Sequence, residues 1–231
     1  MKLEFYSYRY ADAVLKHDSF RRDYKEFEAV LRKAGVPLLP DDKIKHRKRD
    51  AIQASGGLAR YFFLPVDQGT LNGEIAHALP GWQKHPLVVP PEFVEKGKPA
   101  PALKADFKRG KLQIEVQFGN MARWYTDVFK FQLSYSIGAI DVAVLAVPML
   151  RFANLIDENI ANFERVVREL PSAKMSLTLP ILVIGLEPND YRPIFAAYDR
   201  AFERLKEDRN GDAFKIPATK RVKEEPPPED S

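Results

Sequence analysis

The sequence contains no cysteine, which excludes disulfide bonds, a thiol nucleophile and a zinc site with thiolate ligands. It has no apolar run long enough to span a membrane, and residues 1–5 lack the apolar core of a signal peptide. No G-x₄-G-K-[ST] motif occurs, which argues against an ATP-driven enzyme. We therefore expect a protein without a membrane partner and without nucleotide-driven chemistry.

The remaining composition is that of a globular protein. With 231 residues, of which 45% are apolar, residues 1–212 are predicted to form a single domain with one substantial core. Residues 213–231 are rich in proline and charge and are predicted to be a disordered tail. The net charge of +4 permits a polyanionic partner. Basic residues crowd positions 43–49, including Lys43 and Arg47. This segment is either a solvated helix face or an arm that contacts phosphates.

Hydrophobic periodicity predicts an α/β fold. The expected helices are 11–17, 18–35, 72–79, 121–136, 156–170 and 189–207, and the expected strands are 58–64, 112–118, 140–147 and 181–186. Asp18 or Ser19 is expected to cap the second helix, and Asn120 the fourth. Strands 140–147 and 181–186 are almost wholly apolar, which is typical of central strands buried on both faces. The pattern predicts a mixed central β-sheet flanked by helices on both faces.

Strand 112–118 alternates strictly between apolar and polar residues, which predicts a half-buried strand with its polar side in solvent. The Arg109-Gly110 pair that precedes it has the composition of a tight turn. A hairpin closed by these two residues sets Asp106 opposite Gln113 and diagonal to Glu115.

Two carboxylates at this distance, Asp106 and Glu115, together with the carbonyl of Val116, form an oxygen-rich group. Mg²⁺ accepts such a set of one or two carboxylates, a carbonyl and several waters. The alternative is that these are ordinary acidic residues on the solvent-facing side of a strand.

The hairpin also carries a family resemblance. Asp106-Phe107, followed after the turn by Glu115-Val116-Gln117-Phe118-Gly119-Asn120, resembles the active-site hairpin of the BglII-type restriction endonucleases. These are the E-x-Q branch of the PD-(D/E)XK nucleases, in which glutamine replaces the usual lysine. The order and spacing of 61–82, ending at Trp82, is also similar to that family.

The resemblance implies a restriction-endonuclease-like fold and a type II restriction endonuclease. Such an enzyme hydrolyses double-stranded DNA at a specific sequence with Mg²⁺ and leaves 5′-phosphate ends. Asp106, Glu115 and Gln117 would be the catalytic residues, with Asp106, Glu115 and Val116 as metal ligands and Gln117 orienting the attacking water. His85 stands where the family has an asparagine of the water network. It either belongs to that network or is an ordinary loop histidine.

The same resemblance implies partners and DNA contacts. We expect a homodimer in a prokaryotic cytoplasm, with a cognate DNA methyltransferase as its functional partner. The counterpart of loop 148–159 contacts bases in the family, so Arg151 and Asn154 are expected to read bases, unless this is an ordinary surface loop. Contacts are also expected from Asn120 and Arg123 beside the metal site. Lys43 and Arg47 are expected to contact phosphates on the basis of the basic segment alone. The alternative is a DNA-binding protein of this fold that does not cleave, or a nuclease of repair type without sequence specificity.

Overall fold

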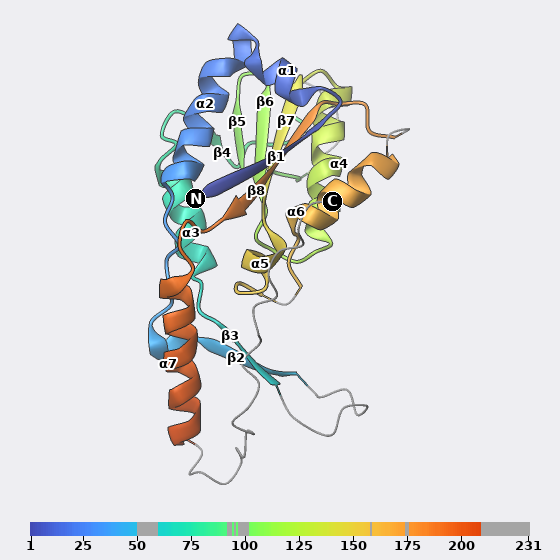
Figure 1. Cartoon of the computed structure of the whole chain (residues 1–231). Coiled ribbons are helices and arrows are strands. Elements are labelled where there is room, and N and C mark those ends of the chain that lie inside the picture. Colours follow the sequence, from blue (N-terminus) through green and yellow to red (C-terminus); the bar gives the residue numbers. More distant parts are fainter. Residues whose placement is uncertain are drawn as a thin grey trace, which may run out of the picture.

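The computed structural model describes residues 1–49, 60–91, 94, 96, 102–157, 159–173 and 176–208. The described strands form a six-stranded sheet of order β1-β8-β7-β6-β5-β4 and a separate two-stranded sheet, β2-β3 (Figure 1). Their bounds are β1 Lys2–Tyr8, β2 Lys45–Arg49, β3 Arg60–Leu64, β4 Gln83–Lys84, β5 Phe107–Arg109, β6 Leu112–Val116, β7 Val142–Pro148 and β8 Ile181–Glu187. The predicted tail 213–231 lies outside the described residues.

All the predicted helices occur in the predicted order, with shifts at their ends, and α5 (Leu150–Ala153) is a further helix that was not predicted. The helices are α1 Ala11–Lys16, α2 Asp18–Lys33, α3 Gln68–His77, α4 Arg123–Ser136, α5 Leu150–Ala153, α6 Phe163–Glu169 and α7 Arg192–Asp208, with 3₁₀ turns η1 Asp41–Lys43 and η4 Leu170–Ala173. None of the described helices is long and apolar enough to cross a membrane.

Two predicted caps and several predicted helix starts were wrong, although α2 begins at Asp18 as predicted. The helix predicted from 72 begins at Gln68. His17 caps α2, because its Nδ1 accepts a hydrogen bond from the backbone N–H of Ser19. Ala122 is the residue that precedes α4, while the Asn120 side chain accepts from the Ala122 N–H outside the helix. The helix predicted from 156 starts only at Phe163, where Asn162 caps it by accepting from the Arg165 N–H.

The sheet is mixed, as predicted, and its centre is parallel. β6, β7 and β8 run parallel to one another, whereas β5 pairs antiparallel with β6 and β4 with β5. β7 is buried along its whole length and β8 all but its last residue, as their apolar sequences indicated. The sequence pattern did not reveal β1, which covers the far edge by pairing antiparallel with β8 from Lys2↔Glu187 to Tyr8↔Ile181.

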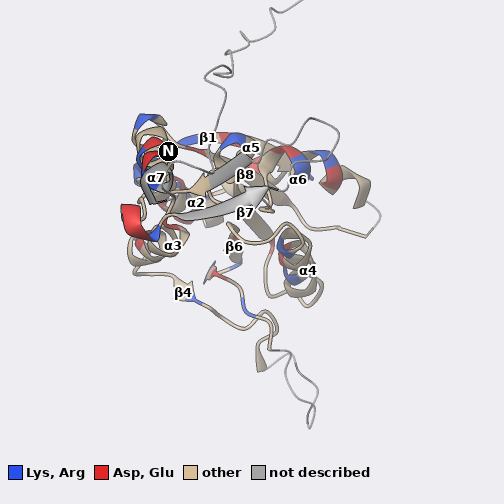
Figure 2. Ribbon diagram, turned by 90° about the horizontal axis from the view of Figure 1, so that it is seen from below, with Lys and Arg blue, Asp and Glu red and all other residues tan. Residues whose placement is uncertain are grey.

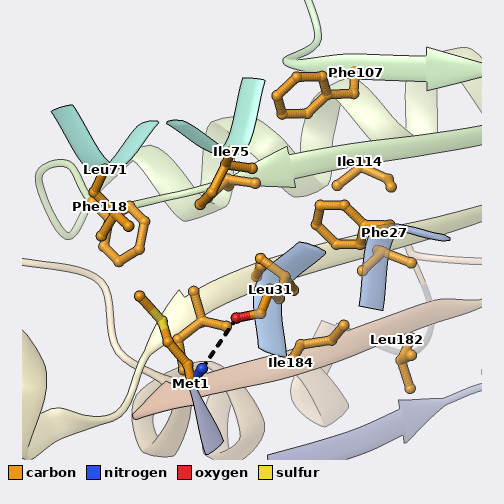
Figure 3. Packing of buried hydrophobic residues seen from close by; sticks show 14 of the residues in the cluster. Met1, Phe27, Leu31, Leu71, Ile75, Phe107, Ile114, Phe118, Leu182 and Ile184 are labelled. Carbon is orange, nitrogen blue, oxygen red and sulfur yellow. Dashed lines mark hydrogen bonds between the residues drawn. The ribbon is translucent and has the colours of Figure 1, made fainter. Parts of the chain in front are cut away.

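Side chains of the central strands alternate between two apolar cores. Val142 and Val144 of β7 join the core formed with α1, α2 and α3, whereas Ala143 and Leu145 join the core formed with α4 and α6. Figure 3 shows the first core, where Leu71 of α3 lies beside Phe118. The helices therefore cover both faces of the sheet, as Figure 1 also shows.

This two-sided covering corrects the expectation for β6. Leu112 and Ile114 point to the α2–α3 core, so Gln113 and Glu115 point to the opposite face, which α4 covers. Gln113 is only 1% exposed and Glu115 only 2%. The polar side of this strand is thus buried, because a helix that lies later in the chain packs over it.

The basic segment 43–49 is not a helix face. Lys45–Arg49 is β2, which pairs antiparallel with β3. Phe63 of β3 packs edge-on against Tyr198 of α7, with 5.1 Å between ring centroids, and this small sheet and α7 lie together away from the main sheet (Figure 1). A phosphate-contacting role for the segment remains a prediction. The surfaces of α2 and α6 carry charges of mixed sign (Figure 2).

Candidate active site

The hairpin β5–β6 holds the residues that the sequence singled out, but its loop lies one residue later than predicted, which shifts the cross-strand pairing by two residues. Arg109 pairs with Leu112 and Phe107 with Ile114, so the two-residue loop is Gly110-Lys111. One step beyond the last pair, Asp106 comes opposite Glu115, where Gln113 had been predicted. The correct register brings the two carboxyl-bearing residues into closer apposition than the predicted one.

Backbone conformation and charge explain this register. Gly110 adopts φ +56°, a conformation that glycine accepts without strain, which suits a residue inside a tight hairpin loop. Arg109 stays in the strand because α2 holds its guanidinium group. Nη1 lies 2.8 Å from Glu26 Oε2 and Nε lies 3.2 Å from Asp23 Oδ1. Composition alone did not reveal these two partners.

Asp106 is held at the end of the hairpin by the next strand. Its Oδ2 accepts a hydrogen bond of 2.8 Å from the backbone N–H of Val116. Burial raises the pKa of Asp106, although the Val116 N–H, Lys130 and His85 act in the opposite direction. A nearby cation therefore stabilises the ionised form of this carboxyl group more than it would stabilise an exposed carboxylate.

Glu115 lies deeper than Asp106. Burial, with the neighbouring Asp106 and Asp127 carboxylates, raises its pKa to about 8. The opposing contact is Lys130, whose Nζ lies 2.7 Å from Glu115 Oε2. Gln113 Nε2 donates a longer bond of 3.3 Å to Oε1. Because burial favours its protonated form, Glu115 would release a proton when a metal ion binds there.

Gln117 is held through both ends of its amide. Its Nε2 donates to Asp127 Oδ2 at 2.6 Å, and its Oε1 accepts from the Gly119 N–H at 2.7 Å. These bonds assign the amide orientation, because one end must donate and the other accept.

Asp127 and Lys130 were missed by the sequence analysis. Asp127 is 3% exposed and Lys130 9% exposed, and both lie on the buried side of α4. A signal was present: Asp127 lies three residues after Trp124 and four before Phe131, so a charged residue interrupts the apolar stripe of the helix.

A cavity of about 480 Å³ connects these groups, and an all-oxygen set of possible cation ligands lines it. The set comprises Asp106, Glu115, Val116 and Asn72 of α3. Asn72 Oδ1 is buried and has no hydrogen-bond partner among the described residues, so a bound cation or its water shell would satisfy it.

Within the described part of the chain, no three histidine or acidic side chains are grouped to hold a metal by themselves. The donor set is therefore two carboxylates completed by neutral oxygens and water, which fits Mg²⁺.

His85 lies on the other side of Asp106. Its backbone N–H donates to the Asp106 carbonyl at 3.0 Å, and with Asp106 and Asn72 it lines a second cavity of about 260 Å³. Its φ of +52° is uncommon for a residue with a side chain. Its position beside Asp106 is compatible with a place in a water network, which stays a prediction.

The residues predicted to contact DNA are spread over the surface. Arg123 lines the 480 Å³ cavity at the start of α4. Asn120 and Asn154 are exposed, and neither lines that cavity. Arg151 stacks over Tyr191, with its guanidinium carbon 4.4 Å from the ring centroid. Lys43 is exposed in η1, and the side chain of Arg47 lies outside the described residues.

Comparisons with known proteins bear on this site. The model of the family "Restriction endonuclease BglII/BglIII" matches residues 3–186. The crystal structure of restriction endonuclease BglII with a DNA 16-mer is similar, with TM-score 0.58, 20% identity and coverage of 80% of this chain and 76% of that one. Free BglII gives TM-score 0.53 and 18% identity, covering 82% and 81%.

The comparison with curated protein sequences found no match. The family match extends from β1 to β8 and includes the hairpin that carries Asp106, Glu115 and Gln117. The sheet described above is likewise shared with BglII. This chain belongs to the BglII/BglIII family of restriction endonucleases, which are type II site-specific DNA nucleases.

Proposed function

We propose that this chain cleaves double-stranded DNA at a specific sequence in a Mg²⁺-dependent reaction, as a homodimer in a prokaryotic cytoplasm. A methyltransferase of the same specificity would protect the host DNA. The observation that carries the proposal is the convergence of Asp106, Glu115 and Gln117 on one cavity of about 480 Å³. BglII, the similar structure, is one that was solved with DNA.

Asp106, Glu115 and the Val116 carbonyl would hold the metal, with Asn72 as a further oxygen donor. When bound there, Mg²⁺ supplies charge stabilisation to the phosphoryl group and lowers the pKa of a water molecule. In the hydrolysis, the water oxygen bonds to phosphorus and the bond to the 3′ oxygen breaks, leaving a 5′-phosphate and a 3′-hydroxyl. Gln117 orients the water or the scissile phosphate, because an amide has no proton-accepting group with a usable pKa.

Digestion of a long sequenced DNA tests activity and specificity together. The wild-type protein should give discrete fragments with Mg²⁺ and none with EDTA. Asp106→Ala and Glu115→Ala should each abolish cleavage while retaining DNA binding, since removing a carboxylate reduces repulsion with phosphate. A smear of products would indicate a non-specific nuclease, and binding without cleavage would indicate a DNA-binding protein of this fold.

Sequence reading is assigned to Arg151 and Asn154, in and just after α5. If either makes a bidentate base contact, its replacement by alanine should weaken discrimination at one base pair by roughly 1–3 kcal/mol. Neutralising Lys43 and Arg47 should instead weaken binding to all sequences alike and reduce its salt dependence. If replacing Arg151 or Asn154 weakened binding to cognate and random DNA equally, the assignment of these two residues to sequence reading would be contradicted.

The dimer is proposed to form through α4. Trp124 packs into the core, but Tyr125 is 47% exposed and Phe129 58% exposed on the outer side of the same helix. Cutting both strands of a palindromic site requires two active sites related by a two-fold axis. Two exposed aromatic residues on the helix that carries Asp127 and Lys130 would place the interface next to the active sites.

A further inference from the structure

Lys130 has no part in the metal binding or water orientation proposed above, yet it is the most densely contacted cation of the site. From α4, its Nζ lies 2.7 Å from Glu115 Oε2, 2.8 Å from Asp127 Oδ1 and 3.1 Å from the Lys104 carbonyl oxygen. An ammonium group has three N–H donors. All three are matched by these oxygens, so Lys130 cannot bind a phosphate without giving up a contact that it already makes.

The Lys130 ammonium group supplies a positive charge that β6 lacks. Position 117 carries an amide, so β6 itself brings no positive charge to the cavity. The helix provides it instead, because Asp127 and Lys130 are three residues apart and therefore lie on one face of α4, above β6. Lys130 meets the Glu115 carboxylate, and Asp127 meets Gln117.

The charges of the cluster can be counted. Three carboxyl groups, those of the half-buried Asp106 and the buried Glu115 and Asp127, interact with one another around the ammonium group of Lys130. When all three are ionised, as Glu115 and Asp106 must be to bind a metal, they leave the cluster two negative charges in excess, which matches one divalent cation. Without Lys130 the excess is three, and buried carboxylates without a cation are strongly unfavourable.

Asp127 divides its two oxygens between the cation and the amide. Oδ1 contacts Lys130, and Oδ2 accepts from Gln117 Nε2. Through this bridge, a displacement of Lys130 is passed to Gln117 as well as to Glu115.

We propose that Lys130 and Asp127 are positioning residues of this nuclease site. Lys130 is its permanent counter-ion: it keeps Glu115 in place before the metal binds and sets how strongly the metal binds. Asp127 fixes the orientation of the Gln117 amide. The inference rests on the proposed function for the roles of Glu115 as a metal ligand and Gln117 as the residue that orients water. The effect of the cluster's charge on Mg²⁺ affinity can be tested without DNA.

A charge series tests the counter-ion role, with Mg²⁺ alone as the probe. The excess negative charge is one in Asp127→Asn, two in the wild type and in the double variant Asp127→Asn/Lys130→Met, and three in Lys130→Met. Mg²⁺ affinity of the full chain, from the rise in Tm on titration, should follow that order. Each step should be roughly tenfold, since a unit charge a few ångströms from the ion is worth at least that factor.

The double variant keeps the test open if Lys130→Met does not fold, because it carries no extra buried charge. The matched control is Lys16→Met, which removes an exposed ion pair with Asp12 one helical turn away and should leave the Mg²⁺ response unchanged. A purely structural pair would lower Tm equally with and without Mg²⁺. Equal Mg²⁺ affinity across the series would overturn the proposal.

Cleavage kinetics test the positioning role. The double variant should bind Mg²⁺ like the wild type, but Glu115 has lost its ammonium contact and the Gln117 amide now donates to a neutral oxygen in place of a carboxylate. Its kcat should therefore fall at least tenfold while KM for DNA stays within about twofold. An unchanged kcat would refute positioning. If the wild type itself cleaves no DNA, the proposed function fails, while the Mg²⁺ series still decides whether Lys130 is the counter-ion.

Discussion

The pKa of Glu115 makes the stability of the metal-free protein depend on pH in a direction opposite to that of ordinary acidic residues. Glu115 is 2% exposed, and burial, Asp106 and Asp127 raise its pKa from 4.5 to about 8 despite the contact with Lys130. The folded state therefore binds this proton more tightly than the unfolded chain does. The resulting stabilisation is fully present below pH 4.5 and is lost as the pH rises through about 8.

The size of the loss follows from the two pKa values. At about 1.4 kcal/mol per pH unit, the difference between 4.5 and about 8 corresponds to a free energy on the order of 5 kcal/mol. The raised pKa of Asp106 acts in the same direction. Since small domains have only about 5–15 kcal/mol of stability, the metal-free protein should be visibly weakened at pH 9.

Urea unfolding from pH 5 to pH 9 in EDTA measures this effect, with fluorescence of the buried Trp82 and Trp124 as the signal. Glu115→Gln removes the titrating group and should flatten most of the decline, so that this variant is the more stable protein at pH 9. Mg²⁺ should restore the wild type at high pH. The exposed Glu4→Gln is the control. An identical pH slope in Glu115→Gln and the wild type would refute the reasoning.

Further outcomes are expected elsewhere. Gln117→Ala should lower the cleavage rate severely and Gln117→Glu should alter its metal dependence, whereas wild-type kinetics for Gln117→Ala would make the residue a bystander. Gly185→Ala should lower the free energy of unfolding by about 1–3 kcal/mol in urea denaturation. An added Cβ would lie 2.5 Å from Met149 Sδ and 2.8 Å from Phe163 Cγ, which is closer than atoms can pack. Phe129→Asp should convert the dimer to a monomer that nicks DNA. Light scattering checks this, and a dimer in that variant would place the interface elsewhere.

Much of the site could be predicted from the sequence because it is local. Asp106, Glu115 and Gln117 lie in or beside one hairpin, so the strict alternation of 112–118 and a nearby glycine predicted that they lie close together, although the predicted register was wrong. The apolar runs of β7 and β8 likewise indicated central strands, since only burial on both faces accounts for them.

Tertiary structure decided the rest. Alternation reports that two faces of β6 differ, but it does not report what covers the polar one. α4 covers it with Lys130 and Asp127, which turned a predicted solvent-exposed face into a buried ionic cluster. The hairpin register depended on the ion pairs of Arg109 with α2, and the edge strand β1 on pairing with β8 at the other end of the chain. These contacts join residues far apart in sequence, and a local pattern carries no information about partners that only packing brings together.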